Sequence, residues 1–265
     1  MENTSAAVQV KPGAGIQTWS MNIAPVNPLN PVMLGALTHC LNAAIADKSV
    51  SAIVLTSSQK VFSAGGDARW MGQLLSERGP DGLVNQFNET MDIFRELCLA
   101  LRNSPLLVIA ALNGHTLAGG LELAAACDLR FAADSERLQI GEMDLFGAMP
   151  SGGGGAQFIG RLMGPTRALQ FILDAKPVSP KAAFEAGLVD RLYDAGVLLS
   201  ETESFAEAVA RKAGRIGIAA AKRAIFGGAE LPLASAMALD HSVHWDAMRR
   251  GNFRDGAVQF VKRFG

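Results

Sequence analysis

The feature that most constrains this chain is an apolar run near its middle. The run from His115 to Leu129, HTLAGGLELAAACDL, places one carboxylate, Glu122, among almost no other polar side chains. An unpaired charge taken out of water costs several kcal/mol, or its pKa shifts until the group is neutral. Two glycines, Gly119 and Gly120, stand directly before this helix-like segment. The fold must bury the segment and either offset the charge of Glu122 or use it.

A second run has the same design. In VFSAGGDARWM, Val61 to Met71, a strand is expected to end, glycines follow, and a helix begins. The first N–H groups of a helix lack partners, and glycine lets the backbone approach a ligand closely. Two such turns on neighbouring strands would aim two N–H groups at one oxygen, as an oxyanion hole does. Two plain strand-to-helix turns would carry the same glycines, so that alternative stays open at this point.

The chain alternates strand-like and helix-like segments. This alternation predicts an α/β fold with helices packed on a largely parallel sheet. The segments are strands at 15–23, 51–57 and 105–112 and helices at 29–46 and 86–101.

From about Val197 onward the pattern is almost entirely helical. We place a boundary near residue 195, between an α/β core (1–195) and a helical C-terminal region (196–265). The apolar faces of this tail are expected to pack on a neighbouring subunit.

Composition excludes several classes of protein. The 265 residues carry 24 basic and 25 acidic side chains, a formal net charge of −1, which argues against a nucleic-acid partner. The three cysteines, Cys40, Cys98 and Cys127, lie far apart in apolar runs, which favours reduced core residues over disulfides or a metal site. No apolar run has membrane-spanning length, and no signal pattern opens the chain. We therefore expect a soluble cytoplasmic protein with no membrane partner and no metal.

Other nucleophile and phosphate motifs are absent from the sequence. It has no G-x-S-x-G elbow, no G-x-x-x-x-G-K-[ST] loop and no dinucleotide fingerprint after a strand. The run SGGGGAQ, 151–157, is glycine-rich and opens a helix but lacks the lysine of a phosphate loop. It is interpreted as a wall of the site and a third helix N-terminus there.

Both glycine runs resemble signatures of one family. VFSAGGDARWM resembles the A-F-x-A-G-A-D-[IL]-x-x-M motif of the crotonase (enoyl-CoA hydratase/isomerase) superfamily, and NGHTLAGGLELAAACDLRFA is similar to its N-G-x-A-x-G-G-G-x-E-L-x-x-x-C-D motif. The likeness extends over nearly the whole chain, to NFRDGAVQFV near the end. It implies a crotonase-like spiral of ββα units, a helical trimerisation tail giving a homotrimer or a dimer of trimers, and an acyl-CoA thioester as substrate, with no further cofactor.

The resemblance also assigns site residues. It implies that the backbone N–H groups of Gly66 and Gly119 form the oxyanion hole and that Glu122 is catalytic. The residues implied to bind coenzyme A or the acyl group are Ala64, Gly65, Asp67, Ala68, Arg69, Trp70 and Met71, with Phe146 and Met149 beside the acyl chain and Lys262 or Arg263 from the tail. His115 is expected to have a structural role.

The sequence offers more than one position for a second carboxylate. The hydratases of this family carry it in P-E-x-x-L-G-x-I-P, and the similar stretch here, IGEMDLFGAMP at 140–150, differs in length by one residue. Counted back from the final proline, the position holds Met143, and counted forward from the start it holds Asp144. We expect Asp144 to fill it, with Glu142 on the other side and no second carboxylate as the alternatives.

The number of carboxylates decides the reaction. Adding water across an enoyl thioester needs one group to activate water and another to supply the α-proton, whereas moving a double bond can use one carboxylate. The sequence therefore predicts a lyase of the enoyl-CoA hydratase type. An isomerase, a decarboxylase, a thioester hydrolase and a non-catalytic binding homologue are the alternatives.

Overall fold

The main sheet has six strands. The computed structural model of the chain describes residues 7–142, 152–251 and 253–264. The strand order is β1-β2-β3-β5-β7-β9, in which β1 pairs with β2 antiparallel and the other pairs are parallel. Central β3 is buried at every position, as expected for a strand covered on both faces. The six strands are β1 Val8–Pro12, β2 Ile16–Met21, β3 Ala52–Ser57, β5 Leu107–Leu112, β7 Leu129–Ala133 and β9 Arg191–Tyr193.

A second sheet of three short parallel strands carries the glycine turns. Its order is β4-β6-β8, with β4 at Val61–Ser63, β6 at His115–Leu117 and β8 at Ile140–Gly141. The turns therefore follow β4 and β6, not the long buried strands β3 and β5. The sequence pattern had indicated the turns as neighbours in one sheet, which is correct, but it did not reveal that this sheet is a separate one.

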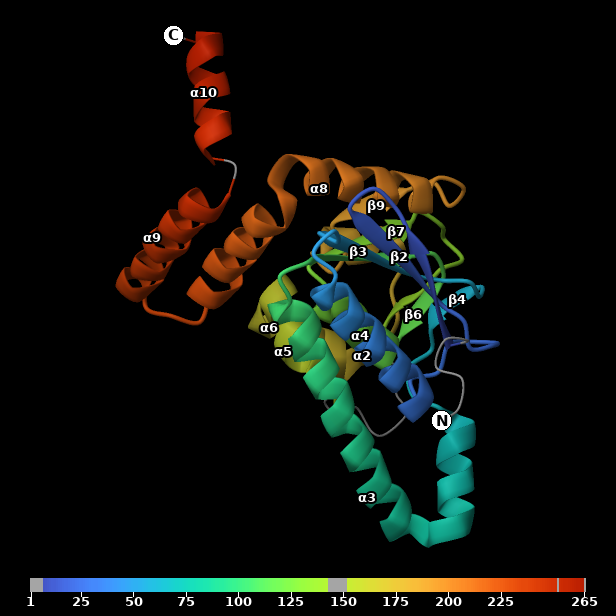
Figure 1. The fold of residues 1–265 in the computed structure, drawn as a ribbon. Coiled ribbons are helices and arrows are strands. Elements are labelled where there is room, and N and C mark those ends of the chain that lie inside the picture. Colours follow the sequence, from blue (N-terminus) through green and yellow to red (C-terminus); the bar gives the residue numbers. More distant parts are fainter. Residues whose placement is uncertain (1–6, 143–151, 252, 265) are drawn as a thin grey trace.

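Helices cover both faces of the main sheet. Figure 1 shows α8 lying across one face, while α2, α4 and the long part of α3 lie together on the other side. Apolar residues of α8, including Leu198 and Ala206, share one buried cluster with β2, β3, β5 and β7. The helices are α2 Pro31–Ala46, α3 Ala68–Asn103, α4 Gly119–Ala126, α5 Gly155–Met163, α6 Pro165–Asp174, α7 Pro180–Glu185, α8 Leu198–Lys222, a π-helical turn η1 Arg223–Gly227, α9 Leu233–Arg250 and α10 Phe253–Phe264.

Helix α3 is longer than the sequence pattern indicated. A helix was expected to begin after the glycines of the first turn and another over 86–101, and α3 includes both, since it begins at Ala68 and is interrupted at Gly79, whose φ is 70°. Pro80 follows this break. The first part of α3 is weakly amphipathic and mostly exposed, so the apolar periodicity that marks the second part is missing there.

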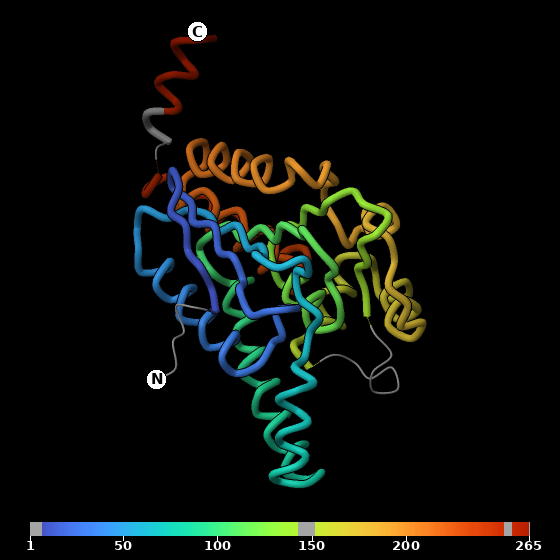
Figure 2. The backbone as a smooth tube through the Cα atoms, turned by 90° about the vertical axis from the view of Figure 1, so that its right-hand side faces the viewer, coloured from blue at the N-terminus to red at the C-terminus, as the bar shows by residue number. Residues whose placement is uncertain are grey.

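The C-terminal helices divide into two parts. Helix α8 packs on the chain's own sheet, so the expectation that the whole tail needs a neighbouring subunit is wrong for this helix. Figures 1 and 2 show α10 projecting away from the body of the molecule. The large apolar side chains that stay exposed on η1, α9 and α10 are Ile225, Leu233, Met237, Trp245, Val258, Phe260, Val261 and Phe264.

A membrane-crossing helix is not found among the described residues, where none combines the length and the apolarity that a bilayer requires.

Candidate functional site

The two glycine turns touch each other. A Cβ atom built on Gly65 would lie 2.8 Å from the backbone nitrogen of Gly119 and 3.0 Å from the Cβ of Ala118. Gly65 also has a φ of +87°, which side chains other than glycine rarely adopt. Glycine is therefore required here, because any side chain would block the Gly119 amide.

The peptide planes of both turns have fixed orientations. The carbonyl of Gly65 accepts a hydrogen bond from the Leu29 N–H at 2.7 Å. The carbonyl of Ala118 accepts from the N–H groups of Leu121 at 2.9 Å and Glu122 at 3.1 Å. In a planar trans peptide the N–H points opposite to the C=O.

The amides of Gly66 and Gly119 are the N–H ends of these two planes. Each therefore points away from the group that binds the preceding carbonyl. In the described part of the chain, neither amide donates to a carbonyl of a turn, loop or cap. Both N–H groups consequently remain available as donors, with Gly66 exposed and Gly119 half-buried.

Glu122 lies in the first turn of α4, a helix that is buried on all sides from Gly120 to Ala126. Its side chain is 3% exposed, and its Oε2 accepts a hydrogen bond of 3.1 Å from the N–H of Gly155, the first residue of α5. A carboxylate near helix N-termini is stabilised by the positive end of the helix dipole. The N-terminus of α5 therefore lies at Glu122, where a third helix N-terminus was expected.

The glycine-rich loop before α5 fits against Glu122 with little room. A Cβ on Gly153 would lie 2.8 Å from Glu122 Oε2 and 2.3 Å from the ring of Phe94. The Phe94 ring also lies within 3.6 Å of a Cβ built on Gly119. Phe94, which sequence reasoning missed because it reads as one more core residue of α3, thus forms the wall between the Gly119 amide and the loop.

Glu142 is the second carboxylate of this region. It follows β8 directly and is buried, with 8% of its surface exposed, so it is not a solvated loop side chain. Burial, and then the charge of Glu122, raises the pKa of Glu142 to about 7. Its Oε1 is buried and has no hydrogen-bond partner in the described part of the chain. The expected carboxylate, Asp144, and the alternative Met143 lie outside the described residues, so the structure does not test that expectation.

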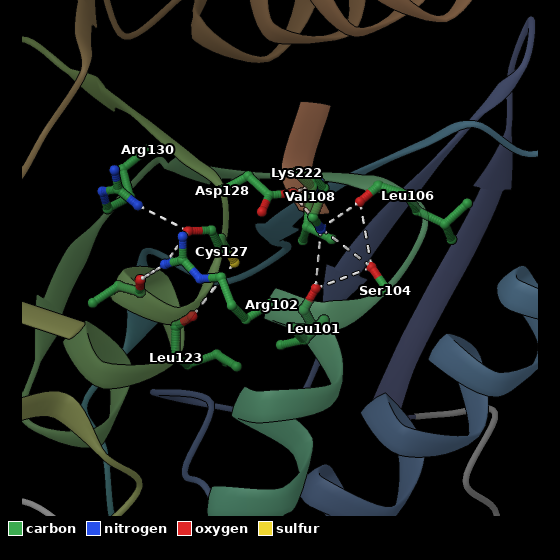
Figure 3. A network of polar contacts seen from close by, with 11 residues as sticks. Leu101, Arg102, Ser104, Leu106, Val108, Leu123, Cys127, Asp128, Arg130 and Lys222 are labelled. Carbon is green, nitrogen blue, oxygen red and sulfur yellow. Dashed lines mark hydrogen bonds and ion pairs between the residues drawn. The ribbon is translucent and has the colours of Figure 1, made fainter. Parts of the chain in front are cut away.

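A polar network fixes the far end of α4 (Figure 3). Arg102 Nη2 donates to the carbonyls of Ala125 at 2.7 Å and Cys127 at 3.1 Å, where α4 ends. Beside it, Lys222 Nζ lies 2.7 Å from Asp128 Oδ2 in a buried ion pair. The last residue of α8 is thus bonded to the segment that follows the Glu122 helix.

The remaining predicted binding residues surround the first turn. Asp67 caps α3 by accepting from the N–H groups of Arg69 and Trp70, and its other oxygen accepts from Asn30 Nδ2 at 2.8 Å. This cap accounts for its side chain without a ligand. A Cβ on Gly66 would lie 4.0 Å from Met71 Sδ, so Met71 is near the exposed amide. Ala64 is half-buried, whereas Ala68 and Arg69 are exposed at the start of α3.

Lys262 and Arg263 are not brought to the site within one chain. Both are exposed in the last turn of α10, which projects away from the body that contains β4 and β6 (Figure 1). Phe146 and Met149 lie outside the described residues. His115 Nδ1 accepts a hydrogen bond from the Gln139 N–H at 3.2 Å, in line with the structural role expected of it. Among the described residues, no group of three or more His, Cys, Asp or Glu side chains is arranged to hold a metal ion.

Comparisons with a family model, with known proteins and with solved structures all indicate the same family. The family model for enoyl-CoA hydratase/isomerase matches residues 13–264. A putative enoyl-CoA hydratase/isomerase of Bacillus subtilis is 31% identical over 238 residues, which cover 89% of this chain and 87% of that protein. The 2,3-dehydroadipyl-CoA hydratase of Escherichia coli is 32% identical over 237 residues, covering 89% and 88%. The crystal structure of an enoyl-CoA hydratase from Bacillus anthracis has a TM-score of 0.88 at 25% identity, covering 97% of this chain and 96% of that one. The chain therefore belongs to the enoyl-CoA hydratase/isomerase family and has the crotonase fold.

Proposed function

We propose that this enzyme is an acyl-CoA lyase of the enoyl-CoA hydratase type, which adds water reversibly across the double bond of a 2-enoyl thioester. The observation that carries the proposal is the placement of two buried carboxylates, Glu122 and Glu142, close enough for the charge of one to raise the pKa of the other. Two carboxylates in one dry site provide the acid and the base that hydration needs.

The thioester oxygen would bind between the amides of Gly66 and Gly119. As a nucleophile adds to the β-carbon, negative charge develops on this oxygen in the enolate. Preorganised N–H donors stabilise such charge, and loss of one donor typically costs about 10²- to 10³-fold in rate. The contact between the two turns supports this role, because the Gly119 nitrogen lies against Gly65, the residue before the Gly66 amide.

The two carboxylates would divide the proton transfers between them. Glu142 holds a proton near neutral pH, because its pKa is raised to about 7. Glu122, hydrogen-bonded by the Gly155 N–H, acts as the carboxylate that takes a proton from water. Water then adds as hydroxide to the β-carbon, Glu142 gives its proton to the α-carbon, and the pair again holds one proton in total.

The coenzyme A part of the substrate would run past the first glycine turn. Ala64, Ala68 and Arg69 are the residues that the exposed side of this turn offers to it. A contribution from Lys262 or Arg263 requires a second copy of the chain, since α10 of the same chain lies elsewhere. We propose for this reason, and because α9 and α10 leave apolar side chains exposed, that the enzyme is a homotrimer or a dimer of trimers.

The direct test uses a short trans-2-enoyl-CoA and follows the loss of its conjugated absorbance. The wild-type enzyme is expected to hydrate it, and Glu122→Gln to lower kcat by about 10²- to 10⁴-fold, the range for a general acid or base. Circular dichroism and coenzyme A binding should be unchanged in this variant. Turnover of Glu122→Gln within a few-fold of wild type would contradict the assignment. An enzyme that shifts the double bond of a 3-enoyl-CoA but hydrates nothing would favour the isomerase.

A further inference from the structure

Ser63 connects the first glycine turn to two other parts of the site. It is the last residue of β4 and is fully buried. Its Oγ donates to the carbonyl of Asn27 at 2.8 Å and accepts from the N–H of Gly65 at 3.1 Å. One hydroxyl therefore joins the loop before α2 to the residue whose carbonyl precedes the Gly66 amide.

The acceptor of this hydroxyl is itself held in place. Asn27 is fully buried, and its Nδ2 donates to the carbonyls of Val61 at 3.2 Å and Phe62 at 3.1 Å. Its Oδ1 accepts from the N–H of Ile23 at 2.8 Å. The Asn27 carbonyl is thus fixed relative to β4, so the hydroxyl of Ser63 has one defined direction.

The backbone of Ser63 also touches the second turn. A Cβ built on Gly120 would lie 2.5 Å from the Ser63 carbonyl oxygen and 2.8 Å from the Ser63 Cβ. Gly120 directly follows Gly119, so the contact with Ser63 sets the distance between the start of α4 and the first turn. The same residue consequently contacts the segments that carry both donors.

We propose that Ser63 is a positioning residue for the two amides of Gly66 and Gly119. Its hydroxyl accepts from the N–H of Gly65 and so holds the residue that precedes the Gly66 amide, and its backbone fixes the separation of the two turns. It acts through these glycines and does not contact the substrate. This inference rests on the proposed function, because it assigns Ser63 to the geometry of the proposed oxyanion hole.

Removal of the hydroxyl has a specific physical consequence. The buried N–H of Gly65 and the buried backbone carbonyl of Asn27 each lose the hydrogen bond that they make with this hydroxyl. Gly65, which has no Cβ, is then still held at its carbonyl by the Leu29 N–H but no longer at its own N–H, so its φ can vary and the direction of the Gly66 amide becomes less fixed. We expect Ser63→Ala to lower kcat about 10-fold, part of the loss caused by deleting one donor. The KM should stay within about 2-fold, because Ala68 and Arg69, which are proposed to contact coenzyme A from the start of α3, lie beyond the altered peptide.

The experiment compares Ser63→Ala with Ser104→Ala. Ser104 is also buried, and its hydroxyl also donates to backbone carbonyls, those of Leu101 and Leu106, but it caps the far end of α3. For both variants, kcat and KM with a trans-2-enoyl-CoA and thermal unfolding are measured. The infrared carbonyl band of a bound thioester is recorded as well, because its shift to lower frequency reports the hydrogen bonds to that oxygen.

The predicted result is a smaller carbonyl shift and a lower kcat in Ser63→Ala only, with similar losses of thermal stability in both variants. Ser63→Cys keeps the size of the side chain with a weaker hydrogen bond and should be intermediate, so it provides the test if Ser63→Ala does not fold. An unchanged carbonyl band in Ser63→Ala, or an equal kcat loss in Ser104→Ala, would overturn the inference about Ser63. The proposed function would still stand in that case, provided that the wild-type enzyme hydrates the substrate. A wild-type enzyme that neither hydrates nor polarises the thioester would overturn the proposed function and this inference with it.

Discussion

At the scale of single residues, Glu142 gives the site its dependence on pH. Its pKa is raised from 4.5 to about 7 in the folded chain. The folded state therefore binds this proton more tightly than the unfolded state. The free energy of unfolding should fall as the pH rises from about 4.5 to about 7, by about 3 kcal/mol, and change little above that from this group.

Activity should follow the same group. If the protonated pair is the active form, kcat/KM decreases above an apparent pKa near 7, a value that belongs to the coupled pair. Glu142→Gln should lose this alkaline limb and the matching slope of stability with pH. Both are measured by pH profiles of turnover and of urea unfolding. An alkaline limb that persists unchanged in Glu142→Gln would assign it to another group.

Ala118 carries backbone strain next to the Gly119 amide. Its φ of 48° and ψ of −123° lie where glycine is normally found. Its N–H donates to the Gly141 carbonyl at 2.9 Å, and its carbonyl accepts from two amides of α4, so both sides are held. Such strain costs about 1–3 kcal/mol. Replacing Ala118 by glycine would relieve it, but part of the gain is lost because glycine also makes the unfolded chain more flexible.

Ala118→Gly should therefore raise the Tm, by about 2–4 °C for a net gain near 1 kcal/mol. Ala175, at φ 47° and ψ 33° after α6, provides the control, since Ala175→Gly relieves an ordinary left-handed residue far from the site and should give a smaller rise. Thermal unfolding of both variants checks this. A lower Tm for Ala118→Gly would show that the conformation is not strained.

At the scale of secondary-structure elements, the buried pair of Lys222 and Asp128 joins α8 to the segment after α4. Burial lowers the pKa of Lys222 and raises that of Asp128, and in both cases the partner's charge opposes the effect. Lys222 Nζ also donates to the Leu106 carbonyl at 2.7 Å. Breaking such a pair leaves an uncompensated charge in the core.

Lys222→Met should reduce the free energy of unfolding by about 3–5 kcal/mol, and adding Asp128→Asn should recover part of this loss. Lys11→Met is the control, because Lys11 pairs with Glu203 at the surface and should contribute at most about 1 kcal/mol. Denaturant unfolding measures all three. Equal effects of Lys222→Met and Lys11→Met would contradict the role of the buried pair.

Local patterns predicted many elements because the physics behind them is local. The strand expected at 51–57 from its β-branched residues is β3, Ala52–Ser57, and the helix expected at 29–46 from its apolar spacing is α2, Pro31–Ala46. The strands β4, β6 and β8 have two or three residues each, too few for any period to show. Their sheet exists because distant segments meet, which no window of sequence records.

The site was predictable in part for the same reason. The glycines of both turns and Glu122 stand in runs whose composition already demands an explanation. Ser63 was not singled out, and Glu142 was only an alternative to Asp144 for the second carboxylate, because the significance of both residues comes from what lies next to them in space. Glu142 is buried beside Glu122, and Ser63 is placed between Asn27, Gly65 and Gly120.

At the scale of the whole molecule, the exposed apolar side chains of α9 and α10 predict assembly. Light scattering should give three or six times the chain mass of 27.9 kDa. Phe260→Glu, on an α10 side chain that is 64% exposed, should reduce the assembled fraction, because a charge would have to be buried. Val10→Glu, on exposed edge strand β1, is the control. A wild-type monomer with full activity would refute the prediction.

The central claim is that Glu122 and Glu142 together hydrate an enoyl thioester beside the amides of Gly66 and Gly119. The most direct test compares Glu142→Gln with Asp144→Asn, measuring the hydration rate of a trans-2-enoyl-CoA. The account predicts that Glu142→Gln loses about 10²- to 10⁴-fold in kcat, equivalent to about 3–5 kcal/mol, while Asp144→Asn stays within a few-fold of wild type. A large loss in Asp144→Asn with near-normal turnover in Glu142→Gln would contradict it and return the second carboxylate to Asp144.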